Sequence, residues 1–139
     1  MNKAVIIYNS KTGTTKKYAE EIGEYIKAKG FDVRLSSIQE YREELLDKAD
    51  YVLLGCWTSG LIFFLQHPQK DWNDFAIKLP NMPDTKMALF TTYKILTGSM
   101  FSNMYHQLNG KLPFPSLKLK SRNRMLSEND RKALDSFIG

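Results

Sequence analysis

Short apolar runs alternate along this chain with segments that have the character of amphipathic helices. Strands are predicted over 3–8, 31–35, 50–54 and 86–92, where the residues are continuously apolar or alternate with polar ones. Helices are predicted over about 15–28, 40–48, 71–79, 99–108 and 127–138. Pro113 and Pro115 exclude a central strand from 111–120, but 116–120 can form an edge strand.

Strand and helix therefore alternate about five times within 139 residues. This rhythm is typical of a doubly wound α/β fold, with five parallel strands in one sheet and helices on both of its faces. No internal repeat, low-complexity segment or linker interrupts it, so we expect a single domain over 1–139.

The loop after the first strand carries the clearest chemical signal. It reads Ser10-Lys11-Thr12-Gly13-Thr14-Thr15 and leads directly into a predicted helix. Its hydroxyl groups can donate hydrogen bonds to phosphate oxygens, and the helix start adds backbone N–H groups and a positive dipole end. The loop lacks both the Gly-Lys-Ser/Thr of a Walker A motif and the glycines of a dinucleotide fold. The alternative is a plain strand-to-helix turn with Thr14 as the helix N-cap.

This loop resembles the phosphate loop of the flavodoxin family, Ser/Thr-x-Thr-Gly-x-Thr. Ser10, Thr12, Gly13 and Thr15 match that pattern, while Thr14 stands where the family often has asparagine. Flavodoxins are a standard example of the rule that open α/β sheets bind ligands at the carboxyl ends of their strands. The resemblance implies the strand order 2-1-3-4-5 and a non-covalently bound FMN, whose phosphate lies on residues 10–15.

The resemblance extends to two loops that in flavodoxins surround the flavin ring. After the third strand the family often has Gly-Cys-Ser-Thr-Trp-Gly, whereas this chain exchanges Trp57 and Ser59. Either Ser59 takes the stacking position and Trp57 packs on the sheet, or the loop turns differently and still presents Trp57. Thr58 lies between them, and Gly60 matches a glycine whose peptide can turn toward flavin N5.

The loop after the fourth strand offers backbone groups to the ring edge in this family. Here the corresponding residues are Thr91, Thr92, Tyr93 and, near the end of the loop, Gly98. Tyr93 matches a tyrosine on the outer face of the flavin, with a plain surface residue as the alternative.

The charge of the chain departs from the acidic character of well-known electron-carrier flavodoxins. The net charge is +5 and the isoelectric point about 9.3. Positive charges scattered over solvated faces would explain this, and no dense basic helix indicates a nucleic-acid partner. Because a basic protein attracts negative charge, electrostatic complementarity instead favours an acidic redox partner protein or an anionic substrate. The basic segment 111–124 forms either part of a docking surface or a solvated edge.

The remaining features bear on the cellular compartment, on metal binding and on the oligomeric state. The lone Cys56 permits no internal disulfide and is expected to be a small buried hydrophobe in a reducing compartment. No apolar stretch approaches the length of a membrane span, and no signal-peptide region is visible, so a cytoplasmic protein without a membrane partner is expected. His67 and His106 lack metal-ligand spacing, and no metal is expected. The apolar run 61–65 is either a buried anchor or a dimer surface, which leaves monomer and homodimer open.

Three functions remain open at this point. The favoured one is a flavin electron carrier, in which the flavin performs the redox step and no side chain is catalytic. The second is an FMN-dependent NAD(P)H oxidoreductase acting on a small acceptor such as a quinone. The third is a binding module that has lost the flavin, against which the intact phosphate loop argues.

Overall fold

A single parallel sheet organises the molecule. The computed structural model describes residues 1–10, 13–57, 70–93 and 100–139. Its strands are β1 (Lys3–Asn9), β2 (Asp32–Ser37), β3 (Tyr51–Trp57), β4 (Lys86–Thr92) and β5 (Leu117–Ser121). They pair in parallel in the order β2-β1-β3-β4-β5. The predicted fold class and strand order are confirmed, and β5 is an edge strand as expected.

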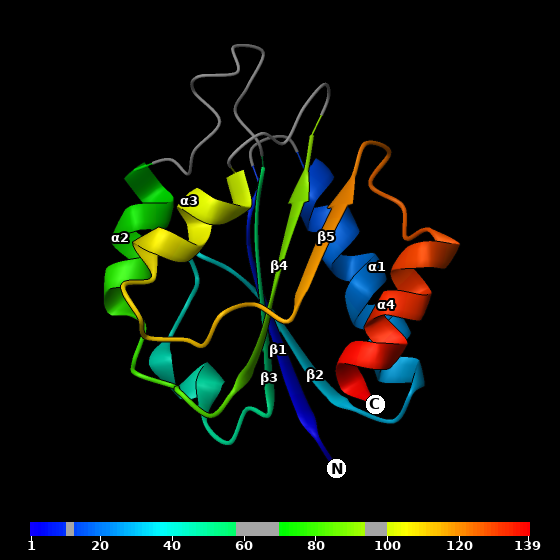
Figure 1. The fold of residues 1–139 in the computed structure, drawn as a ribbon, viewed down its shortest axis with the longest axis horizontal. Helices are drawn as coiled ribbons and strands as arrows, with labels where there is room; N and C mark the ends of the chain where they lie inside the picture. The colour runs from blue at the N-terminus through cyan, green and yellow to red at the C-terminus, as the bar shows by residue number, and fades with distance from the viewer. Residues whose placement is uncertain (11–12, 58–69, 94–99) are drawn as a thin grey trace.

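Helices cover both faces of this sheet. They are α1 (Thr14–Ala28), α2 (Lys70–Lys78), α3 (Met100–Gln107) and α4 (Glu128–Ile138). Figure 1 shows α1 and α4 on one side of the sheet and α2 and α3 on the other. Ser127 caps α4 by accepting a hydrogen bond from the N–H of Asp130, whose carboxylate accepts one from the N–H of Ser127.

Alternate strand residues supply two separate cores. Val5 and Ile7 belong to the cluster under α2 and α3, whereas Ala4 and Ile6 belong to the cluster under α1 and α4. All four side chains are fully buried. A strand covered on both faces must be apolar at every position, which explains the continuous apolar runs in the sequence.

The predicted helix over 40–48 is wrong. The chain forms only one 3₁₀ turn there, η1 (Glu43–Leu46), with hydrogen bonds between residues three apart. Leu46 is buried in this turn and Leu45 is partly buried against the same core, and so short a segment gains little from helix propagation. Lys48 then adopts a left-handed conformation with φ of 59°, which turns the chain toward β3.

The strand predicted over 50–54 extends further than expected. Gly55, Cys56 and Trp57 continue β3 and pair with the last three residues of β4. Gly55 gives room to the ring of Phe90 beside it, so here a glycine serves close packing within a strand instead of a turn. Residues 58–69, which follow β3, lie outside the described residues.

Both ends of the chain lie at the amino-terminal edge of the sheet, opposite the edge where the strands end (Figure 1). The N–H of Lys3 donates to the carboxylate of Asp50 at 2.9 Å. At the other end, the ammonium of Lys86 donates to the carbonyl of Phe137 at 3.1 Å. In the part of the chain that the structure describes, no helix combines the length and apolarity needed to cross a bilayer.

Candidate functional site

A serine hydroxyl binds backbone N–H groups at the start of α1. Ser10 directly follows β1, and its Oγ accepts hydrogen bonds from the N–H groups of Gly13 at 3.0 Å and Lys16 at 3.2 Å. Gly13 has φ of 89°, a left-handed conformation that favours glycine. Gly13 is the N-cap residue, whereas Thr14 is already the first residue of the helix. Lys11 and Thr12 of the predicted phosphate loop lie outside the described residues.

The electrostatics at this helix end favour an anion. The first turn of α1 contains no acidic residue, and it exposes Lys16 and Lys17. The helix dipole adds partial positive charge at the same place. In contrast, the first turn of α4 contains Glu128 and Asp130, which already compensate its dipole. The end of α1 is therefore suited to an external anionic group in a way that the end of α4 is not.

A hydroxyl pair joins this helix to the end of β4. Thr15 is fully buried, and its Oγ1 lies 2.6 Å from Oγ1 of Thr92. One hydroxyl donates to the other, and the remaining proton is left for a further acceptor. Two residues far apart in the sequence, both predicted to bind the cofactor, are thus in direct contact at the carboxyl edge of the sheet.

The end of β3 lies in the interior of the same edge. Cys56 is fully buried, as expected, and the side-chain amide of Asn9 approaches its sulfur at 3.7 Å. The hydroxyl of Thr91 donates to the carbonyl of Cys56, so this predicted site residue ties β4 to β3. Trp57 is half-buried and packs against the core under α2 and α3.

Two positively charged side chains lie beside Tyr93, one from β5 and one from the residue that follows it. The N–H of Tyr93 donates to the carbonyl of Ser121 at 3.1 Å. The ammonium of Lys120 lies 5.8 Å from the centre of the tyrosine ring, and the guanidinium carbon of Arg122 lies 5.3 Å from it. Sequence reasoning missed this neighbourhood, because only the pairing of β4 with β5 brings the two segments together. Thr58, Ser59, Gly60 and Gly98 fall in ranges that the structure does not describe.

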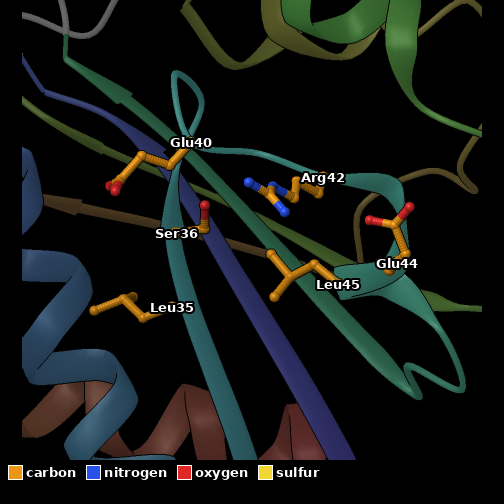
Figure 2. A pocket seen from close by; sticks show the side chains of 6 residues that line it. All are labelled: Leu35, Ser36, Glu40, Arg42, Glu44 and Leu45. Carbon is orange, nitrogen blue, oxygen red and sulfur yellow. The ribbon is translucent and has the colours of Figure 1, made fainter.

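A concave region lies away from these residues. An open hollow of about 670 Å³ lies beside β2. Figure 2 shows the side chains that line it, Leu35, Ser36, Glu40, Arg42, Glu44 and Leu45. The side chains around it carry charges of both signs, and none of them was predicted to bind the cofactor. Among the described residues, no group of three or more His, Cys, Asp or Glu side chains is arranged to hold a metal ion.

Comparisons with known proteins give one consistent family. A family model described as Flavodoxin matches residues 6–113. A flavodoxin from Maridesulfovibrio salexigens is 38% identical over 61 residues, which are 43% of this chain and 42% of that protein. The match therefore spans less than half of the length of this curated relative.

Solved structures of flavodoxins share the fold. The two-electron reduced flavodoxin of Megasphaera elsdenii has a TM-score of 0.70 at 24% identity, and the match covers 96% of each chain. The oxidised flavodoxin 2 of Bacillus cereus has a TM-score of 0.72 at 22% identity, with 97% of this chain and 94% of that chain covered. These two likenesses place the whole described sheet and its helices in the same architecture.

Proposed function

The chain belongs to the flavodoxin family, and we propose that it binds FMN non-covalently at the carboxyl edge of its sheet and carries electrons to a partner protein. The family binds FMN, and the sheet has the topology in which such a ligand lies beside the first and third strands. The observation that carries the proposal is the start of α1, where a serine hydroxyl, backbone N–H groups and exposed lysines gather without any carboxylate in the first turn.

These groups fit the phosphate of FMN. Ser10 uses its oxygen to accept two N–H groups, so its proton remains a donor for a phosphate oxygen. We assign the rest of the cradle to the remaining residues of the loop, Lys11, Thr12, Gly13, Thr14 and Thr15. Such a loop stabilises a dianion mainly with neutral donors and the helix dipole, while Lys16 adds charge at its rim.

The ring belongs, in this proposal, between the segments that follow β3 and β4. Trp57 is the last residue of β3 and Tyr93 directly follows β4, so both are candidates to contact the ring, and we assign Thr58, Ser59, Gly60 and Gly98 to the backbone around it. Thr91 and Thr92 fix the ends of the strands, because one binds the carbonyl of β3 and the other the hydroxyl of α1. When bound, FMN supplies one- and two-electron redox chemistry, and the protein tunes it.

The partner in this proposal is an acidic protein. A net charge of +5 favours encounter with a negative surface, because complementary charge accelerates association. The same charge is opposite to that expected of acidic electron carriers, so their basic partners are poor candidates.

A binding experiment tests the proposal through the phosphate. Purified apoprotein is titrated with FMN and, separately, with riboflavin, and the quenching of flavin fluorescence gives each Kd. We expect Ser10→Ala to weaken FMN binding by about tenfold or more, since a donor to a charged group is lost, and to leave riboflavin binding unchanged. Ser136→Ala, on the exposed side of α4, is the matched control.

Two results would contradict it. If Ser10→Ala weakens the binding of FMN and of riboflavin equally, Ser10 does not bind the phosphate. If the protein binds no flavin at all, the proposed function is wrong. Rapid oxidation of NAD(P)H by the FMN-loaded protein, without a partner protein, would favour the oxidoreductase alternative over the carrier.

A further inference from the structure

The positive charge of this protein is segregated along the chain. Residues 85–127 contain seven Lys and Arg residues and no Asp or Glu. The rest of the chain contains thirteen basic and fifteen acidic residues, so the whole positive excess comes from this one stretch. The stretch includes β4 and β5, the last two strands in the order of the sheet, and α3, which contacts β4. The charge is therefore an asymmetry of the molecule and not an even coating.

Edge strand β5 presents part of this charge in a row. Lys118 and Lys120 are exposed and alternate with the buried Leu119. They pair with Leu89 and Thr91 of β4, so they extend from the face of the sheet that carries α2 and α3. Arg122 follows two residues later and continues the row beyond the strand. Successive cations are spaced by about 6–7 Å along the chain.

Each cation of this row lies close to an aromatic ring. The ammonium of Lys118 lies 5.2 Å from the ring centre of Phe114, which is 66% exposed. Lys120 and Arg122 both lie within 6 Å of the ring centre of Tyr93. We call these five residues the β5 ridge. Within the described residues, no ion pair joins Lys118 or Lys120 to a carboxylate, so their charge is available to an external partner.

Protection of a sheet edge is the simplest alternative role for these lysines. Charged side chains on edge strands prevent pairing with other chains. That role is served by either sign of charge and does not require a long stretch without acidic residues. It also gives no reason for the row to continue past β5 to Tyr93, which follows the end of β4 at the edge where the cofactor site is proposed.

We propose that the β5 ridge is the docking surface for the acidic face of a redox partner protein. The inference rests on the proposed function and adds the place of contact. The ridge ends at Tyr93, so a protein held there lies next to the proposed flavin site, where electron exchange needs it. Lysine and arginine steer the partner by long-range attraction, while Phe114 and Tyr93 provide apolar area for close contact.

Charge reversal on the ridge tests the proposal. FMN-loaded protein is chemically reduced and mixed by anaerobic stopped flow with cytochrome b5, an acidic haem protein, or with benzoquinone, a neutral oxidant. The test variant is Lys118→Glu/Lys120→Glu, which keeps the edge strand charged. The control is Lys27→Glu/Lys132→Glu, which makes the same change of net charge on exposed positions of α1 and α4.

We expect the ridge variant to lower the second-order rate with cytochrome b5 by about tenfold or more at low salt, and the control to lower it by less than about threefold. High salt should remove most of the difference, and the rate with benzoquinone should not change. Equal losses in the two variants would overturn the proposal, because net charge alone would then explain them.

Failure of the docking proposal can be told from failure of the proposed function. A protein that binds no flavin, or whose bound flavin does not react with benzoquinone, contradicts the function. For the ridge alone, fluorescein-labelled polyglutamate is titrated into the apoprotein, and the ridge variant should weaken binding more than the control. Tighter ridge-dependent binding to single-stranded DNA or to phosphatidylglycerol vesicles would overturn the assignment to a protein.

Discussion

Replacing Gly55 with alanine places a methyl group where the ring of Phe90 already lies. An ideal Cβ at Gly55 would be 2.0, 2.2 and 2.4 Å from three atoms of that ring. Carbon atoms in contact are normally about 3.5–4.0 Å apart, so the ring must retreat by about 1.5 Å. Phe90 is fully buried and packs edge-on against Tyr18, with ring centres 6.0 Å apart. Moving the ring would therefore disturb its packing against Tyr18.

Overpacking of this kind costs about 1–3 kcal/mol and sometimes more. With a urea m-value of about 1–3 kcal/mol per M for a small protein, a loss of about 2 kcal/mol lowers the midpoint of unfolding by about 1 M. Urea unfolding followed by circular dichroism measures it. Phe90→Leu in the same background should recover part of the loss, giving a coupling energy of about 1 kcal/mol between the two positions.

Gly23→Ala is the matched control for this prediction. The added Cβ would lie 3.5 Å from Ile6 and 3.6 Å from Val33, which is ordinary contact. Alanine is also the better helix former by about 1 kcal/mol, so this variant should be as stable as the original protein or more stable. The reasoning is refuted if Gly55→Ala unfolds at the original midpoint, or if its loss and that of Phe90→Leu simply add.

Two further predictions concern buried hydroxyl groups. Burial and the neighbouring Asp130 hold the pKa of Tyr18 far above its usual value of 10.0, and burial raises the pKa of Tyr41 to about 12. As the pH rises, the unfolded chain loses these protons before the folded chain does, so the free energy of unfolding should fall above about pH 10. Tyr18→Phe should make that fall less steep, as measured by urea unfolding midpoints across the same pH range. The second prediction concerns the hydroxyls of Thr15 and Thr92. Either Thr15→Val or Thr92→Val alone should lower the free energy of unfolding by about 1–3 kcal/mol, because each leaves a buried hydroxyl without its partner. The double variant should lose less than the sum in thermal unfolding, and additive losses would mean that the two hydroxyls do not depend on each other.

Elements with a strong local signal could be predicted from the sequence. β1 and β4 are continuous apolar runs because helices cover both of their faces, and α4 begins where Ser127 and Asp130 form a reciprocal cap. The strand order came from a family resemblance and not from periodicity. The predicted strand over 50–54 stops before Gly55 for a physical reason, since a glycine in sequence indicates freedom of the backbone but does not reveal that a neighbouring ring needs the space.

Only those contacts of the site that join residues close in sequence could be predicted. Ser10 and Gly13 lie three residues apart, and the hydrogen bond between them belongs to one loop. The contact of Thr15 with Thr92 crosses 77 positions of the chain, and it depends on the register of a whole sheet. The cations beside Tyr93 depend on the pairing of β5 in the same way. Residue types therefore indicated the chemistry, while the folded sheet decides which groups meet.

The position of the two chain ends has a practical consequence. Both lie at the amino-terminal edge of the sheet, where the main-chain N–H of Lys3 and the carbonyl of Phe137 are held by hydrogen bonds. A tether fused to either terminus would therefore attach the molecule by its base and turn the opposite edge outward. Immobilised in this way on a biosensor chip or an electrode, the protein would present its reactive end to solution, and two tethers of different length should give the same orientation.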